Sequence, residues 1–280
     1  MTGRRPVPGG VRPSVDVTRR GAVAEVIIGD GTRHNVLGSR EWIALEHAFG
    51  DLAADDMVRA VVLAGRDRSF CAGFDVREWD GAEPADVEVA FGRMEAACAA
   101  IENLPVPVVA KISGVAAGAG CQLALASDLR VFGRRALIGM PIARLGILAS
   151  PSFAARLSLL AGPGAARDLL YTGRLIGSDE AARLGLVTRC VPEPQLDGAT
   201  DVLVQSIIVH PAAAVRAAKR AVGAGLGPAI KAARIAAGGP AVNYSDFREG
   251  VAAFLRGERH PEPDAGPAGD HGPLARANGR

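Results

Sequence analysis

Hydrophobic and polar positions alternate along this chain in short blocks, and the blocks predict an order of strands and helices. Nearly continuous apolar runs at 58–64 and 108–112 predict fully buried strands. Residues 39–51 and 87–103 carry apolar side chains at helical spacing, which predicts two amphipathic helices, with Ser39 as the N-cap of the first. Because strand, turn and helix recur to residue 191 without a long linker, we expect a single α/β core.

The same patterns complete the predicted core with shorter elements. We expect further strands at 15–17, 22–28, 129–132, 136–138 and 186–191 and further helices at 152–161, 165–171 and 178–184, with another buried helix opening within 115–128. The two helices at 152–171 are separated by Gly162-Pro-Gly164, and the charged residues 77–86 are expected to form a mobile loop.

The two ends of the chain differ in pattern from this core. Residues 1–10 are rich in Gly, Pro and Arg and are expected to be a disordered arm, followed by the core at 11–195. Residues 196–258 are an alanine-rich helical region, with expected breaks at His210-Pro211 and Gly225–Pro228. Residues 259–280 contain several Pro and Gly and are expected to be a disordered tail.

Composition narrows the class of protein. The 280 residues carry a net charge of only +2, which gives no reason to expect nucleic acid as a partner. The four cysteines form no Cys-x-x-Cys pair, and the N-terminus lacks the apolar stretch of a signal peptide. No apolar run is long enough to span a membrane. We therefore expect a cytoplasmic protein with reduced thiols and no membrane contact.

Two glycine-containing loops follow the two buried strands and are the candidate chemistry of the chain. They are Ser69-Phe-Cys-Ala-Gly-Phe-Asp75 and Gly114–Gln122, and the second opens a buried helix. The first turn of a helix has N–H groups without intrahelical partners, which suit an anionic oxygen. Two such loops can supply two N–H donors to one oxyanion. By spacing alone they could equally be ordinary turns.

The residues of these loops resemble a known family. Residues 58–79 and 105–128 are similar to the two signature regions of the enoyl-CoA hydratase/isomerase (crotonase) superfamily, and 169–187 and 245–254 match two further regions in the same order. The resemblance covers roughly residues 15–260. It implies an α/β fold with a crotonase-like ββα spiral core and a C-terminal α-helical trimerisation region, which gives a homotrimer or hexamer.

The resemblance also implies a ligand and its contacts. The ligand is an acyl-CoA thioester, with coenzyme A as part of the substrate and with no separate cofactor or metal. The oxyanion donors would be the backbone N–H groups of Phe74 and Ala119, the second of which is commonly glycine in the family. Coenzyme A would contact two segments, Arg33 and His34 in one and Phe70, Ala72, Gly73 and Phe74 in the other. Asp75 and Asp128 match positions that we interpret as structural, their carboxylates accepting backbone N–H bonds.

The departures from the family pattern concern its acid and base groups. A hydratase of this family holds a water between two glutamates, and these positions match Gln122 and Ile142 here. A third position, an aspartate in some members, matches Ser150. Gln122 can hydrogen-bond a substrate or water but cannot exchange a proton, and Ile142 can do neither. We therefore expect weak or no classical hydratase activity.

Several functions remain open after these departures. An oxyanion hole alone suits decarboxylation, carbon–carbon cleavage or hydrolysis of a thioester carried by coenzyme A or by an acyl-carrier protein. A non-catalytic acyl-CoA binding protein is the alternative from another class. Protons could come from water, from the substrate, or from Glu78, Asp80 or Glu83, which are more typical of solvated surface groups. Cys121 and Ser150 are weak candidates for a nucleophile because no histidine is placed to activate either.

Overall fold

The computed structural model of the protein describes residues 14–258, so the predicted arm at 1–10 and tail at 259–280 lie outside the described residues. A six-stranded sheet runs through the molecule in the order β1-β2-β3-β4-β6-β9. Its strands are β1 (Val15–Arg20), β2 (Val23–Ile28), β3 (Ala60–Gly65), β4 (Val108–Ile112), β6 (Leu129–Gly133) and β9 (Arg189–Val191). Only β1 is antiparallel to its neighbour, as an edge hairpin, and the buried strands β3 and β4 lie at the centre as predicted.

A second, three-stranded sheet brings the two glycine loops together. It contains β5 (Val115–Ala117), β7 (Leu137–Gly139) and β8 (Leu175–Gly177) in that order. Cys71, from the first loop, bonds to both ends of β5: its N–H donates to Val115 O at 2.9 Å and its carbonyl accepts from Ala117 N at 2.9 Å. The first loop is thereby fixed beside the start of the buried helix that follows β5.

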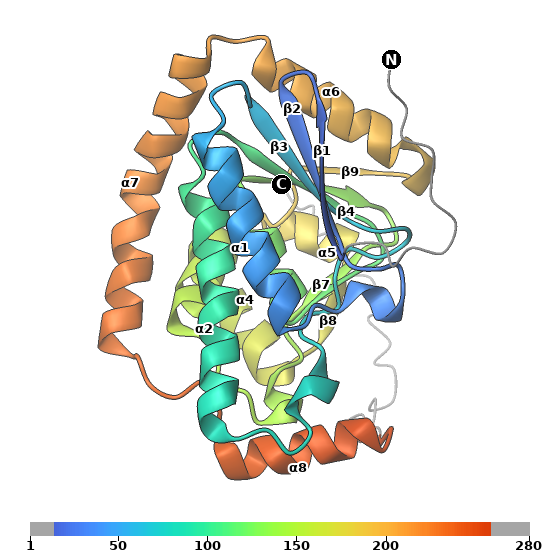
Figure 1. The fold of residues 1–280 in the computed structure, drawn as a ribbon, viewed down its shortest axis with the longest axis vertical. Coiled ribbons are helices and arrows are strands. Elements are labelled where there is room, and N and C mark those ends of the chain that lie inside the picture. Colours follow the sequence, from blue (N-terminus) through green and yellow to red (C-terminus); the bar gives the residue numbers. More distant parts are fainter. Residues whose placement is uncertain (1–13, 259–280) are drawn as a thin grey trace, which may run out of the picture.

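Eight helices in the described part of the chain surround the sheets. They are α1 (Ser39–Ala54), α2 (Pro84–Asn103), α3 (Ala119–Ala126), α4 (Pro151–Thr172), α5 (Ser178–Arg183), α6 (Leu196–Ile208), α7 (Ala212–Ala236) and α8 (Tyr244–Leu255). Four short 3-10 helices are η1 (Arg33–Asn35), η2 (Val76–Trp79), η3 (Ala143–Leu145) and η4 (Glu193–Gln195). Figure 1 shows α1 and α2 side by side, α7 along one edge and α8 across the lower end.

Several helix boundaries differ from the predictions. The break expected at Gly225–Pro228 is wrong, because α7 continues through Pro228, where alanines on both sides favour helix. The break at His210-Pro211 is confirmed between α6 and α7. The N-cap of α1 is Gly38 rather than Ser39, because both polar groups of Ser39, its N–H and its Oγ, bond to the carboxylate of Glu78. Gly162 interrupts α4 with φ 81°, which confirms the expected break there.

The segment expected to be a mobile, charged loop is held by an aromatic side chain. Trp79 is 6% exposed and stacks on Phe74, with a centroid separation of 4.6 Å, and on Phe91 at 5.4 Å. The Oη of Tyr244, on α8, donates to Ala82 O at 2.7 Å. The charge pattern of residues 77–86 did not reveal this packing, because one buried tryptophan outweighs several solvated charges in fixing a short segment.

The C-terminal helices differ in how they are covered. Leu196, Leu203 and Val204 of α6 pack on the main sheet, whereas α7 contains no buried residue. In the described part of the chain, no single helix has the length and hydropathy needed to cross a membrane. One bent pair, Glu193–Ile208 with Ala212–Ala236 at 103°, meets the length and composition criteria only when taken together.

Candidate active site

A cavity of about 1430 Å³ opens where the two glycine loops meet α2, α8 and the segment that follows β7. Its wall includes Phe74 from the first loop and Ala119 from the first turn of α3. The remaining wall includes side chains of η1, η2, α2, η3, α4 and α8 and residues 237–241. The cavity is therefore built from segments distant in sequence, with the two predicted oxyanion donors on the same wall.

The backbone around these two donors is tightly packed. Gly73 has φ +106°, and a Cβ at this position would lie 3.0 Å from Ala117 O and 3.1 Å from Ala119 N. A side chain at Gly73 would thus crowd the Ala119 amide. Among residues 14–258, neither Phe74 N–H nor Ala119 N–H donates a hydrogen bond to a protein acceptor. Two neighbouring backbone donors are therefore available to a ligand oxygen.

The first turn of α3 allows this close approach because its residues are small. Gly118, the N-cap, has φ 55°, a conformation that favours glycine. A Cβ on Gly120 would lie only 2.0 Å from Cys71 O. All eight residues of α3 are buried, so the macrodipole of the helix acts in a region of low dielectric.

The three positions predicted to depart from the family pattern all line the cavity. Gln122 is 5% exposed; its Nε2 donates weakly to Met94 Sδ at 3.7 Å, and its Oε1 has no hydrogen-bond partner in the described chain. Ile142 is half-buried at the start of η3. Ser150 is the N-cap of α4, where its Oγ accepts from Phe153 N at 3.3 Å. The wall therefore contains polar and apolar groups at these positions but no carboxylate.

The predicted coenzyme A contacts are only partly brought together. The cavity wall includes four of them, Arg33, His34, Ala72 and Phe74. It does not include Gly73 or the side chain of Phe70, which is fully buried in the core. Phe70 is therefore part of the hydrophobic core. The sequence alone does not show whether an apolar residue in a glycine-rich motif faces the core or the cavity.

The loop that carries Arg33 and His34 is held in an unusual conformation. Arg33, His34 and Asn35 have φ of 46°, 55° and 57°, three consecutive left-handed residues. The buried Asn35 side chain fixes the turn, because its Oδ1 accepts from Gly31 N at 2.9 Å and its Nδ2 donates to two carbonyls. His34 Nδ1 lies 2.7 Å from Ser69 Oγ. Non-glycine residues in this region are strained, so several hydrogen bonds are needed to hold them.

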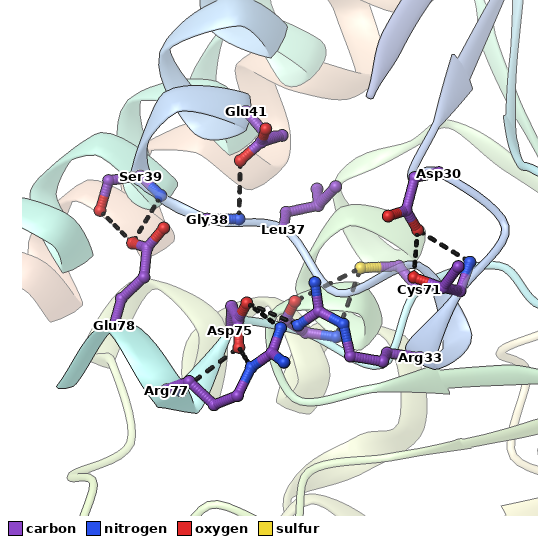
Figure 2. A network of polar contacts seen from close by, with 12 residues as sticks. Asp30, Arg33, Leu37, Gly38, Ser39, Glu41, Cys71, Asp75, Arg77 and Glu78 are labelled. Carbon is purple, nitrogen blue, oxygen red and sulfur yellow. Dashed lines mark hydrogen bonds and ion pairs between the residues drawn. The ribbon is translucent and has the colours of Figure 1, made fainter. Parts of the chain in front are cut away.

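Two arginines converge on one carboxylate at the cavity wall, as Figure 2 shows. Arg33 Nη1 is 2.6 Å and Arg77 Nη2 is 3.0 Å from Asp75 Oδ2. Asp75 Oδ1 also accepts from Arg77 N at 3.3 Å, which confirms the predicted structural role of this carboxylate. Burial raises the pKa of Asp75, and the Arg33 charge opposes that rise. The Asp128 carboxylate also has the predicted structural role, since its Oδ2 accepts a hydrogen bond from Val108 N at 2.7 Å.

The acids suggested from the segment after Asp75 do not reach the cavity. Glu78, Asp80 and Glu83 are absent from its wall. Figure 2 shows the Glu78 carboxylate turned to Ser39, whose N–H and Oγ lie at 2.9 and 2.8 Å. Glu78 therefore stabilises the start of α1 instead of serving the cavity.

Sequence reasoning missed a different acid, Glu95 on α2. Glu95 belongs to the cavity wall, and its Oε1 is buried without a hydrogen-bond partner in the described chain. The one available signal was its helical spacing: Glu95 follows Phe91 by four residues, so both lie on one face of α2. Apolar periodicity alone does not tell which polar residues face an internal cavity.

The described residues provide neither a reactive thiol at the cavity nor a cluster of metal ligands. Burial raises the pKa of the Cys121 thiol to about 12, so it is not a thiolate near neutral pH. Within residues 14–258, no group of three or more His, Cys, Asp or Glu side chains is arranged to hold a metal ion. The expectation of no metal stays a prediction.

Comparisons with known proteins agree with this geometry. The sequence model of the Enoyl-CoA hydratase/isomerase family matches residues 18–261. A short-chain-enoyl-CoA hydratase from Clostridium acetobutylicum is 30% identical over 247 residues, 86% of this chain and 94% of that protein. A probable enoyl-CoA hydratase from Rhodobacter capsulatus is 34% identical over 222 residues, 78% of this chain and 83% of that protein.

Solved structures confirm the predicted fold class. An enoyl-CoA hydratase from Mycobacterium smegmatis superposes with a TM-score of 0.72 at 32% identity, covering 89% of this chain and 98% of the other. An enoyl-CoA hydratase/carnithine racemase from Magnetospirillum magneticum gives 0.74 at 27% identity, covering 88% and 94%. With the fold, the extent of the family match and the relatives in agreement, the chain belongs to the enoyl-CoA hydratase/isomerase family.

Proposed function

We propose that this chain is an enzyme acting on an acyl-CoA thioester, of the lyase or isomerase type, whose main catalytic device is stabilisation of an enolate or tetrahedral oxyanion. The observation that carries the proposal is the pair of neighbouring N–H groups, Phe74 and Ala119, which have no acceptor in the described chain and lie on one cavity wall. Each such donor is worth about 10²–10³-fold in rate when its oxyanion is formed.

The acid and base groups of a classical hydratase are not part of the proposal. Gln122 and Ile142 occupy the positions at which the family's hydratases carry glutamates, so hydration of an enoyl thioester is expected to be weak or absent. Decarboxylation, carbon–carbon cleavage and thioester hydrolysis depend more on the oxyanion than on two carboxylates. They are the favoured reactions, on a thioester of coenzyme A or of an acyl-carrier protein.

The remaining parts of the proposal concern the ligand and the assembly. Arg33 and His34, which line the cavity with Ala72 and Phe74, are proposed to contact the phosphates of coenzyme A. Coenzyme A enters as part of the substrate, with no separate cofactor or metal. The protein is proposed to be cytoplasmic and a homotrimer or hexamer, with neither nucleic acid nor a membrane as a partner.

The test removes one N–H without removing the helix. Ala119 is the first residue of α3, where proline is well tolerated because that N–H has no helical acceptor. Ala119→Pro is expected to lower kcat about 10²–10³-fold on any thioester turned over in a panel of crotonyl-, malonyl- and butyryl-CoA. Ala119→Gly keeps the N–H and is the matched control, expected to retain activity. Calorimetry would follow binding of the same thioesters.

Two results would count against this function. Full activity of Ala119→Pro would mean that the Ala119 amide does not hold the oxyanion. Binding of thioesters by the wild-type chain without turnover of any member of the panel would favour the alternative, a non-catalytic acyl-CoA binding protein.

A further inference from the structure

Glu95 is the carboxylate of the cavity wall that the fold leaves without a hydrogen bond. The described wall contains three other acids, and each is held by a neighbour. Asp75 pairs with Arg33 and Arg77, Glu88 Oε1 accepts from Ala241 N at 2.7 Å, and Glu258 pairs with Arg256. Glu95 Oε1, by contrast, is buried and unpartnered. A buried carboxylate oxygen without a partner is costly, which makes a structural role a poor explanation.

The surroundings of Glu95 add to this contrast. Arg156 is 5% exposed on α4, and its Nε is 2.6 Å from Glu102 Oε1. Arg156 is therefore paired with Glu102, two helical turns after Glu95 on α2. It forms no ion pair with Glu95 in the described chain. Arg156 acts on Glu95 through its charge alone, and no hydrogen bond occupies Glu95 Oε1 in the described chain.

Glu95 directly follows Met94, a residue of α2 that contacts α3. Met94, the preceding residue, contacts Gln122 through Sδ and Nε2 at 3.7 Å. Gln122 is three residues after Ala119, on the adjoining turn of α3, and its Oε1 also lacks a partner. Two unsatisfied acceptors, one on each helix, thus border the cavity that contains the Phe74 and Ala119 amides.

We infer that Glu95 is the catalytic acid–base residue of this site, supplying from α2 the proton transfer that Gln122 and Ile142 cannot supply. This role rests on the proposed function. Glu95 removes a proton from the α-carbon of the acyl group: the C–H bond breaks, its electron pair forms the carbon–carbon double bond of the enolate, and the thioester oxygen takes the negative charge. Phe74 and Ala119 N–H groups hold that oxygen. The reverse step returns a proton from the Glu95 carboxyl to the α-carbon, so no oxidant or reductant is needed.

The proton step can be measured by itself, without knowing the full reaction. Butyryl-CoA in D₂O is the probe, and deuterium incorporation at its α-carbon is followed by mass spectrometry. Glu95→Gln has nearly the same shape and is expected to lower the exchange rate about 10²–10⁴-fold, with the Kd for butyryl-CoA and the Tm unchanged. Asp86→Asn, at an exposed position on the same helix and outside the cavity wall, is the matched control and is expected to exchange like the wild type.

Chemical rescue separates proton transfer from packing. Glu95→Ala leaves room beside α2, and added formate or acetate is expected to restore part of its exchange rate. A purely structural loss would not respond to a small carboxylate. Exchange by Glu95→Gln at the wild-type rate, or an Ala variant that carboxylates leave unchanged, would overturn the role of Glu95 alone. A wild-type chain that binds butyryl-CoA but neither exchanges nor turns over any thioester would overturn the proposed function, and this role with it.

Discussion

At the scale of single residues, we propose that Gln122 and Ile142 limit which of the family's reactions this cavity can perform. Both line the cavity, but an amide cannot exchange a proton and an aliphatic side chain cannot hold water. The one unpaired acid of the wall, Glu95, belongs to a different helix. The site therefore has one candidate proton-transfer group where a classical hydratase uses two.

Restoring the two carboxylates is the residue-scale prediction. The wild-type chain is expected to hydrate crotonyl-CoA slowly or not at all. The double variant Gln122→Glu, Ile142→Glu is expected to raise the rate by about 10²–10⁴-fold, because a positioned acid or base contributes that much. Loss of absorbance of the enoyl thioester measures the rate. The matched control is Gln122→Asn, Ile142→Leu. A wild-type kcat in the usual enzyme range, abolished by Gln122→Ala, would contradict the prediction.

At the scale of elements, the buried side chain of Arg130 fixes the C-terminal end of α3. Arg130, on β6, is 5% exposed; its Nε donates to Leu186 O at 2.7 Å and its Nη1 donates to Ser127 O at 2.7 Å and Ala124 O at 3.3 Å. Burial lowers the pKa of Arg130 to about 10, which still leaves it charged at neutral pH. Its bonds satisfy carbonyls at the C-terminal end of α3, which have no helical partners.

The expected result of Arg130→Met is a loss of about 3 kcal/mol in the free energy of unfolding, because buried carbonyls lose a charged donor. Urea unfolding followed by circular dichroism measures the change. Arg134→Met, at an exposed position just after the same strand, is the control and should change the free energy by less than about 0.5 kcal/mol. Equal stability of the two variants would show that Arg130 does not hold α3.

Elements with a long, regular pattern were predictable from the sequence, and short or context-dependent ones were not. The apolar runs of β3 and β4 have few alternatives to a buried strand. The three-residue strands β5 and β8 are too short for any period to appear. The motifs predicted that Phe74 and Ala119 lie at one site, and both line the cavity. Glu95 was missed because apolar periodicity shows which face of a helix is buried but not which polar side chain borders a cavity.

At the scale of the whole molecule, the exposed apolar side chains of α7 are not covered by any other part of the described chain. None of its residues is buried within the described chain. Val222 and Ile235 are 63% and 74% exposed, and Leu226 is 37% exposed. Large apolar side chains gathered along a long helix are costly in water and are typical of surfaces that pack against another copy. The proposed homotrimer or hexamer would cover them.

Light scattering coupled to size exclusion gives the mass of the assembly directly. The wild-type protein is expected to run at three or six times the chain mass of 28.8 kDa. Val222→Glu, Leu226→Glu places two charges on the exposed side of α7, and burying them in an interface without partners is unfavourable. This variant is expected to shift toward the monomer while its circular dichroism spectrum is unchanged. Met57→Glu, an exposed apolar position outside α7, controls for added charge. A monomeric wild type, or an α7 variant with the full assembly mass, would refute a role for α7 in association.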